Sequence, residues 1–237
     1  MSGEVLSPPP IFPTIAPEVG MDVVDEAKSF LISYLRGKEN AEDRAYPWKE
    51  SWEYVVHHSF RTESYAEEII VSTAGISEKD ALLIRTAAVL HDIGSLDDRK
   101  NHAKAGAAIV RTWTTNKKSF SEHFDTKELS KLIAGHQKKD PKEKDIRMAV
   151  LCDADLLDGV GAMSIFMMAH KASPSSHDYP RQVMEIMNSE GLDYLKKKRG
   201  KLATEAGKEL FDRKAEFVET FYRELKDELK GTENLPL

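Results

Sequence analysis

Cysteine is nearly absent from this sequence: Cys152 is the only one among 237 residues. A single thiol excludes an intrachain disulfide and a zinc site built from several cysteines. Long apolar runs are also missing, which excludes a transmembrane helix. The N-terminus lacks the basic and apolar segments of a secretory signal, so we expect a cytoplasmic protein.

An excess of positive charge is missing as well. The chain has 34 Lys and Arg against 40 Asp and Glu, a net charge of −6. This balance argues against a general nucleic-acid binder and against duplex nucleic acid as a partner. It still allows a small phosphorylated substrate in a locally positive pocket. No membrane partner is expected, and a homodimer is left open.

Proline is concentrated at the N-terminus. Residues 1–20 contain five of the ten prolines, so this segment is predicted to be extended or disordered. It is interpreted as a tail that lies on the body or in solvent, with a docking peptide as the alternative. Residues 21–231 are predicted to form one domain, since 41% hydrophobic content suffices for a sizeable core.

Apolar residues recur at helical spacing along that domain. The first periodic stretch runs from Val23 to Leu35 and ends at Gly37, and Ser77 precedes another in a capping-box arrangement with Asp80. No alternating strand pattern of useful length is present, so the fold class is predicted to be all-α, a helical bundle. The remaining helices are predicted at 51–73, 77–94, 102–114, 126–138, 144–170, 179–196 and 204–230.

Several histidines and aspartates fall on the apolar faces of these helices. A single inward histidine is usually a hydrogen-bonded core residue, and a single aspartate often caps a neighbouring helix. Six such residues together carry a large desolvation cost unless a cation gathers them. The six are His58, His91, Asp92, His102, His136 and Asp155.

A divalent metal meets this requirement. Imidazole nitrogen and carboxylate oxygen suit Mn, Fe, Co, Ni or Zn, and the lack of thiolates disfavours a structural zinc. Adjacent residues on a helix point about 100° apart, but His91 and Asp92 at a helix end can converge on one ion beyond the terminus. Gly94 then lets the chain turn away.

The order of these residues resembles the HD superfamily of metal-dependent phosphohydrolases, and in particular its single-domain hydrolases. His58 and Arg61 form a His-x-x-Arg start, and "LLIRTAAVLHDIG" resembles the helix and His-Asp pair of the family. The segments "NHAKAGAAIV" and "AVLCDADLLDGVGA" resemble two further family motifs. The C-terminal stretch from "YLKKKRGKL" onward is similar to the tail of that branch. The resemblance covers roughly residues 50–230 and implies an HD-domain bundle.

The resemblance implies a ligand set. His58, His91, Asp92 and Asp155 would bind a metal that activates water, and Asp92 would also be catalytic. Asp92 would bridge to a second ion held by His102 and His136, so one or two ions are expected. Alternatively, these two histidines bind substrate phosphate or support the ligands. His57 remains an alternative to His58, and Asp153 and Asp158 remain alternatives to Asp155.

Phosphate needs positive donors. Arg61 is the first candidate, as a catalytic or substrate-binding group or as the partner of a ligand carboxylate; Lys104 is the second. Other basic residues near the motifs are Arg99, Lys100, Lys138 and Lys139. The basic run at 196–201 is interpreted as a solvated helix face.

The activity that the resemblance favours is hydrolysis of a phosphate ester or anhydride of a nucleotide. Two alternatives remain. One is di-iron oxygenase chemistry, which relatives with four histidines and two aspartates carry out. The other is a nucleotide-binding sensor that signals without catalysis.

Overall fold

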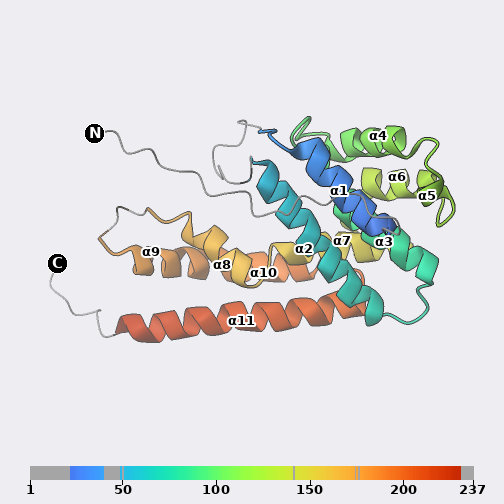
Figure 1. The fold of residues 1–237 in the computed structure, drawn as a ribbon. Helices are drawn as coiled ribbons and strands as arrows, with labels where there is room; N and C mark the ends of the chain where they lie inside the picture. The colour runs from blue at the N-terminus through green and yellow to red at the C-terminus, as the bar shows by residue number, and fades with distance from the viewer. Residues whose placement is uncertain are drawn as a thin grey trace, which may run out of the picture.

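The structure, a computed structural model, describes residues 22–39, 49, 51–140, 142–173, 175 and 177–230. These residues form eleven α-helices and no strand beyond one isolated bridge between Glu39 and Ser51 (Figure 1). The all-α prediction is confirmed. The Pro-rich segment at 1–20 lies outside the described residues. None of the described helices has the length and apolarity to cross a bilayer.

The helices follow the sequence prediction with two exceptions: the short helix α5, Lys118–Ser121, was not predicted, and one predicted helix is divided. Residues 144–170 were predicted to be a single helix, but α7 ends at Asp158 and α8 begins at Ala162. The break comes at Gly161, whose φ of +79° is a left-handed conformation that favours glycine. The bounds are α1 Val23–Leu35, α2 Trp52–Val71, α3 Glu78–Leu90, α4 His102–Thr114, α5 Lys118–Ser121, α6 Thr126–Gly135, α7 Ile146–Asp158, α8 Ala162–Ala169, α9 Tyr179–Ile186, α10 Leu192–Arg199 and α11 Glu205–Leu229.

Side-chain caps start most of the long helices where the sequence suggests. The Ser77 hydroxyl accepts the Asp80 backbone N–H at 3.1 Å, and this confirms the predicted cap of α3. Ser51 and Thr204 cap α2 and α11 in the same way. A π-helical turn, Met187–Gly191, joins α9 to α10, so the predicted 179–196 helix is continuous but irregular.

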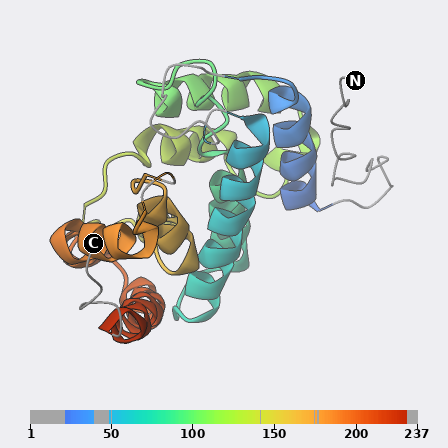
Figure 2. The same cartoon turned by 90° about the vertical axis from the view of Figure 1, so that its left-hand side faces the viewer.

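Helices α2, α3 and α7 pack against one another at the centre of the molecule, with α1 against α3 and α4 against α6 (Figure 2). Leu90, Ile133 and Leu151 are fully buried among them. Helices α8 to α11 gather on the other side of α2 and α7 (Figure 2). The C-terminal end of α3 therefore meets the first half of α2 and the second half of α7.

Asp153 ties α7 to the start of α11. Its buried carboxylate accepts the backbone N–H groups of Ala203 and Thr204 at 2.9 and 2.8 Å, and the Thr204 hydroxyl at 2.7 Å. A Cβ on Gly207 would lie 2.6 Å from Asp153 Oδ2, so glycine allows this close approach. Asp153 is thus occupied in joining two helices.

Candidate metal centre

Helix ends place three of the four inward histidines. His91 and His136 follow the last residues of α3 and α6, and His102 is the first residue of α4. The Nδ1 atoms of His91 and His136 lie 2.8 and 2.7 Å from the carbonyl oxygens of Ala88 and Ile133. These carbonyls belong to the last helical turn, where carbonyl groups lack partners. Each bond fixes the ring and turns its Nε2 away from the helix.

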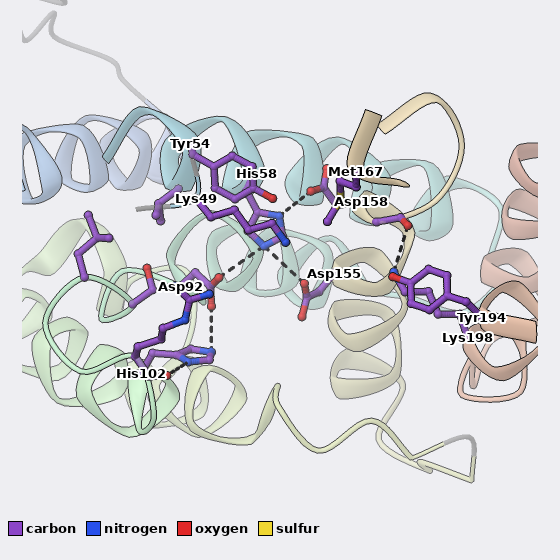
Figure 3. Close-up of a pocket in the computed structure, with 15 residues that line it drawn as sticks. Lys49, Tyr54, His58, Asp92, His102, Asp155, Asp158, Met167, Tyr194 and Lys198 are labelled. Carbon is purple, nitrogen blue, oxygen red and sulfur yellow. Dashed lines mark hydrogen bonds and ion pairs between the residues drawn. The ribbon is translucent and has the colours of Figure 1, made fainter. Parts of the chain in front are cut away.

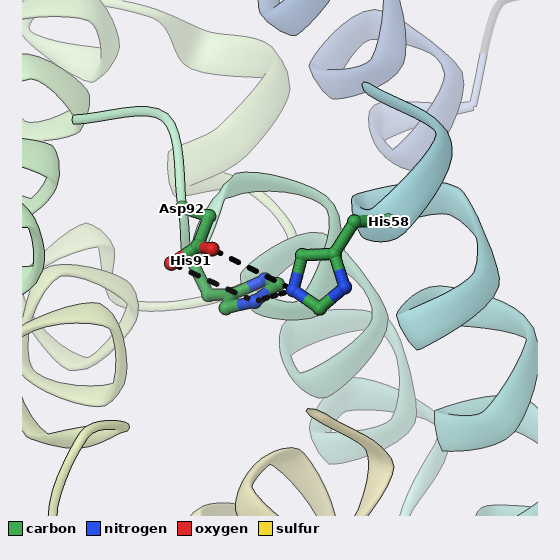
Figure 4. A group of neighbouring side chains, drawn as sticks. All are labelled: His58, His91 and Asp92. Atoms are coloured by element: carbon green, nitrogen blue, oxygen red, sulfur yellow. Dashed lines mark hydrogen bonds and ion pairs between the residues drawn. The ribbon is translucent and has the colours of Figure 1, made fainter. Parts of the chain in front are cut away.

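One group of ligand atoms surrounds His58, which lies in the first half of α2. Its Nε2 lies 3.1 Å from Nε2 of His91 and 3.5 Å from Oδ2 of Asp92 (Figure 4). It also lies 3.5 Å from Oδ1 of Asp155. His91 Nε2 is 3.8 Å from an oxygen of each carboxylate. Four potential ligands from α2, α7 and the end of α3 therefore face one small volume.

A second group adjoins the first through Asp92. Oδ1 of Asp92 lies 3.1 Å from Nε2 of His102 (Figure 3). The same oxygen lies 3.4 Å from Nε2 of His136. The two imidazole nitrogens are 3.3 Å apart. The Asp92 carboxylate thus stands between two histidine pairs, one on each side.

The hydrogen bonds of the four rings indicate which ring nitrogens bond outside the cluster and which face into it. His58 Nδ1 lies 2.7 Å from the Asp158 carboxylate, and His102 Nδ1 lies 2.8 Å from the carbonyl oxygen of Arg99. With His91 and His136 bonded as above, all four rings use Nδ1 outside the cluster. The four Nε2 atoms and the two carboxylates therefore face one another, an arrangement that favours a cation among them. This donor set fits one or two divalent metal ions.

The groups around Asp92 keep its carboxylate ionised, as metal binding requires. Burial raises the pKa of Asp92, but the imidazoles of His91, His102 and His136 outweigh burial and hold this pKa well below its usual value. Burial lowers the pKa of His91 to about 4. At neutral pH the carboxylate is ionised and His91 is neutral, which are the states that ligate metal.

His58 has a different environment. Burial opposes its charge, but the carboxylates of Asp155 and Asp158 outweigh burial and raise the pKa of His58 to about 10. Without a metal, a proton on His58 supplies the positive charge that the cluster needs. A metal at this position has to displace that proton.

Arg61 and Asp158 support His58 from behind. The Arg61 guanidinium donates two bonds to Asp158, from Nε at 2.5 Å and from Nη2 at 3.1 Å. Burial raises the pKa of Asp158, but His58 and Arg61 outweigh it and bring this pKa to about 2. The chain from Arg61 through Asp158 to His58 Nδ1 orients the imidazole.

Lys139 supports the other aspartate. Its ammonium donates to the Asp155 carboxylate and, at 2.7 Å, to the carbonyl oxygen of His136. Burial raises the pKa of Asp155, but the charge of Lys139 and the bond from His58 outweigh it, so the pKa lies well below its usual value.

The structure separates the sequence candidates. It brings His58, His91, Asp92, His102, His136 and Asp155 together, whereas the alternative His57 is exposed and Asp153 binds the start of α11. Asp158 lies behind His58, and Arg61 pairs with it. Lys104 is exposed on α4 and does not line the adjoining cavity.

A cavity of about 340 Å³ opens beside the cluster (Figure 3). Its lining includes residues that were not identified from the sequence, among them Tyr54, Met167, Tyr194 and Lys198. Tyr54 precedes His58 by one turn, and the two rings are nearly parallel with centroids 6.3 Å apart. Lys198 belongs to the basic run that was interpreted as a solvated face. That interpretation is wrong for Lys198, which is half-buried and contacts the end of α7.

This bundle and its His-Asp cluster define the class of protein. Residues 55–159, which contain the whole cluster, match the family model of the HD domain, so this part of the chain is an HD domain. The resemblance seen in the sequence is confirmed.

Two solved structures have a similar fold. A predicted HD superfamily hydrolase from an uncultured Thermotogales bacterium is 21% identical with a TM-score of 0.55, over 87% of this chain and 93% of that one. Bacillus subtilis YpgQ, solved in complex with ADP, is 17% identical with a TM-score of 0.51, over 88% and 98% of the two chains. At these identities the likeness establishes the fold alone. No curated protein matches this chain.

Proposed function

We propose that this protein is a metal-dependent phosphohydrolase that cleaves a phosphate ester or anhydride of a nucleotide. The observation that carries the proposal is the Asp92 carboxylate between the His58–His91 pair and the His102–His136 pair. A carboxylate shared by two ligand groups is suited to hold two ions close together. Such a pair stabilises both the attacking and the leaving oxygens of a phosphoryl transfer.

The residues divide into two ligand sets. His58, His91, Asp92 and Asp155 would hold the first ion. Asp92, His102 and His136 would hold the second. When bound, divalent ions lower the pKa of a coordinated water to roughly 7 and polarise a phosphoryl oxygen. Imidazole ligands favour Mn²⁺, Fe²⁺, Co²⁺, Ni²⁺ or Zn²⁺ over Mg²⁺.

Other residues of the chain position these ligands. Arg61 and Asp158 fix the His58 ring, so we assign Arg61 a positioning role rather than direct contact with phosphate. Lys139 holds Asp155 in its ionised state and, through the carbonyl of His136, links the two ligand sets. Substrate phosphate would approach from the cavity, whose walls carry Arg99 and Lys198.

The nucleotide part of the proposal has a separate basis. YpgQ, a protein of the same fold, was solved with ADP. The cavity beside the cluster also combines basic side chains with Tyr54 and Tyr194, and this suits a phosphorylated aromatic ligand.

The test is release of phosphate or pyrophosphate from a panel of nucleoside mono-, di- and triphosphates, with each metal in turn. We expect turnover with the later divalent ions and none after chelation. If the metal-loaded protein releases neither product but consumes oxygen with a polyol, the oxygenase alternative replaces this proposal. If it binds a nucleotide without any turnover, the sensor alternative does.

A further inference from the structure

The cavity beside the ligand cluster continues past α10. A second cavity, of about 380 Å³, shares Gly159, Met167 and Tyr194 with the first. Each alone is near the lower end of the range typical of ligand sites, roughly 300–1,000 Å³, and together they lie well inside it. A ligand with one end at the cluster thus has room to extend across Tyr194.

Lys198 lines the first cavity and contacts Gly159 and Tyr194, which line both cavities. Its Nζ donates to the carbonyl oxygens of Gly159 and Leu156 at 3.1 and 3.4 Å, at the end of α7 (Figure 3). It also lies 4.7 Å from the centre of the Tyr194 ring. Among the described residues, no carboxylate lies within ion-pair distance of this ammonium. A half-buried cation without an anionic partner is costly, and an incoming anion would relieve that cost.

Gly159 leaves the space that the Lys198 ammonium occupies. A Cβ at Gly159 would lie 2.2 Å from Lys198 Nζ. Any side chain at position 159 would therefore push the ammonium off its carbonyls, while the flexible lysine stem allows the helices to remain in place. Burial also lowers the pKa of Lys198 to about 8, so the ammonium is still charged at neutral pH.

Other residues that line the cavity are less polar than Lys198. Tyr194 and Met167 are half-buried and present aromatic and thioether surface. The second cavity is also lined by Asp193, Ser189, Lys171 and Lys197. The two cavities together therefore offer the candidate metal ligands, a cation, an aromatic and thioether surface, and hydrogen-bonding groups.

We propose that α10 forms the nucleoside side of the active site, where Lys198 binds a phosphoryl oxygen and Tyr194 with Met167 holds the sugar and base of a nucleoside di- or triphosphate. The inference deepens the proposed function and rests on it for the placement of the phosphate chain at the cluster. A nucleotide fits this set of groups because it is anionic at one end and carries a planar apolar ring and hydroxyl groups at the other.

The first test compares a nucleoside triphosphate with inorganic tripolyphosphate, which has the phosphate chain but neither sugar nor base. Tyr194→Ala should lower the ratio of kcat/KM for the two substrates by about tenfold, because loss of a stacking surface affects only the nucleotide. A ratio within about twofold of the wild type would overturn the role of Tyr194.

The second test concerns the phosphate. Lys198→Met and Gly159→Ala, which displaces the ammonium without removing it, should each raise KM for both substrates by about tenfold. Lys196→Met is the matched control, since Lys196 lies on the same helix and outside both cavities. If Lys198→Met raises KM no more than the control does, the phosphate contact is overturned.

Calorimetric binding of ADP keeps this inference separate from the proposed function. If the wild type binds ADP but hydrolyses no nucleotide, the hydrolase proposal fails. Weaker ADP binding by the Tyr194 and Lys198 variants would still support the nucleotide-binding role of α10. If the wild type hydrolyses nucleotides and these variants bind ADP as tightly as the wild type does, the hydrolase proposal is supported and the nucleotide-binding role of α10 is overturned. A wild-type protein that does not bind ADP would also overturn the nucleotide-binding role of α10.

Discussion

Asp92 Oδ1 lies 3.1 Å from His102 Nε2, while the other oxygen of the same carboxylate faces His58 at 3.5 Å. One side chain at the end of α3 thus joins ligands that come from α2 on one side and α4 on the other. Replacing it should disturb both ligand groups at once.

Asp92→Ala should remove most of the bound metal and abolish hydrolysis, because both ligand sets lose their shared oxygen donor. The helices do not depend on this carboxylate, so the far-ultraviolet circular dichroism spectrum should stay helical. Metal analysis by mass spectrometry, with His57→Ala as the control on an exposed histidine, measures the loss. Full metal occupancy in Asp92→Ala would contradict the assignment.

His136→Ala tests the number of ions. The His136 ring contributes to the second ligand set and lies beside Asp92 Oδ1 at 3.4 Å. We expect the variant to drop from about two ions per chain to about one and to lose most of its kcat. An unchanged ion count with an increased KM would instead make His136 a phosphate-binding residue.

Arg61→Lys tests the chain that orients His58. Lysine keeps the charge but cannot make the two parallel bonds to Asp158. Loss of such supporting contacts typically costs about 10- to 100-fold in metal affinity or activity. We expect weaker metal binding and a lower kcat with KM little changed. An increase in KM alone would show that Arg61 binds substrate phosphate directly.

The identity of the metal and the pH should both affect the rate. Mn²⁺, Co²⁺ or Ni²⁺ should support faster turnover than Mg²⁺, which prefers oxygen ligands and keeps its waters.

The rate should rise with pH to about neutrality as the coordinated water loses its proton. Metal affinity should also rise with pH, because the pKa of His58 is raised to about 10 in the metal-free protein and its proton has to leave. Steady-state rates and metal titrations across pH 5–9 measure both effects.

Lys198→Met should stabilise the protein at pH 7, by about 1 kcal/mol after the loss of its two hydrogen bonds is allowed for. Burial lowers the pKa of Lys198 from 10.5 to about 8, so the folded state carries the full cost of this charge below pH 8. As pH rises from 8 to 10.5, only the unfolded state stays protonated, so this cost declines. Denaturant unfolding at pH 7 and pH 10 should show the gap between variant and wild type narrowing. Destabilisation at pH 7 would make Lys198 a structural tether.

The sequence alone determined the helical class and the residues of the His-Asp cluster. Periodicity and caps such as Ser77 identify the helices because these signals are local. His58 could be preferred to His57 because only His58 has Arg61 three residues later, and the structure places Asp158 against both His58 and Arg61. Inward histidines and aspartates were recognisable because an apolar helix face seldom carries so many polar groups.

Only the tertiary structure decided which of these groups meet and what surrounds them. That Asp92 lies between two histidine pairs follows from the packing of α3 against α2 and α6, which no local pattern encodes. The break at Gly161 was missed because the apolar periodicity continues across it. Lys198 looked like one of several solvated lysines, since its burial depends on α10 packing against the end of α7, about 40 residues earlier in the chain. Contacts of that range depend on how the helices assemble, and composition and spacing do not report them.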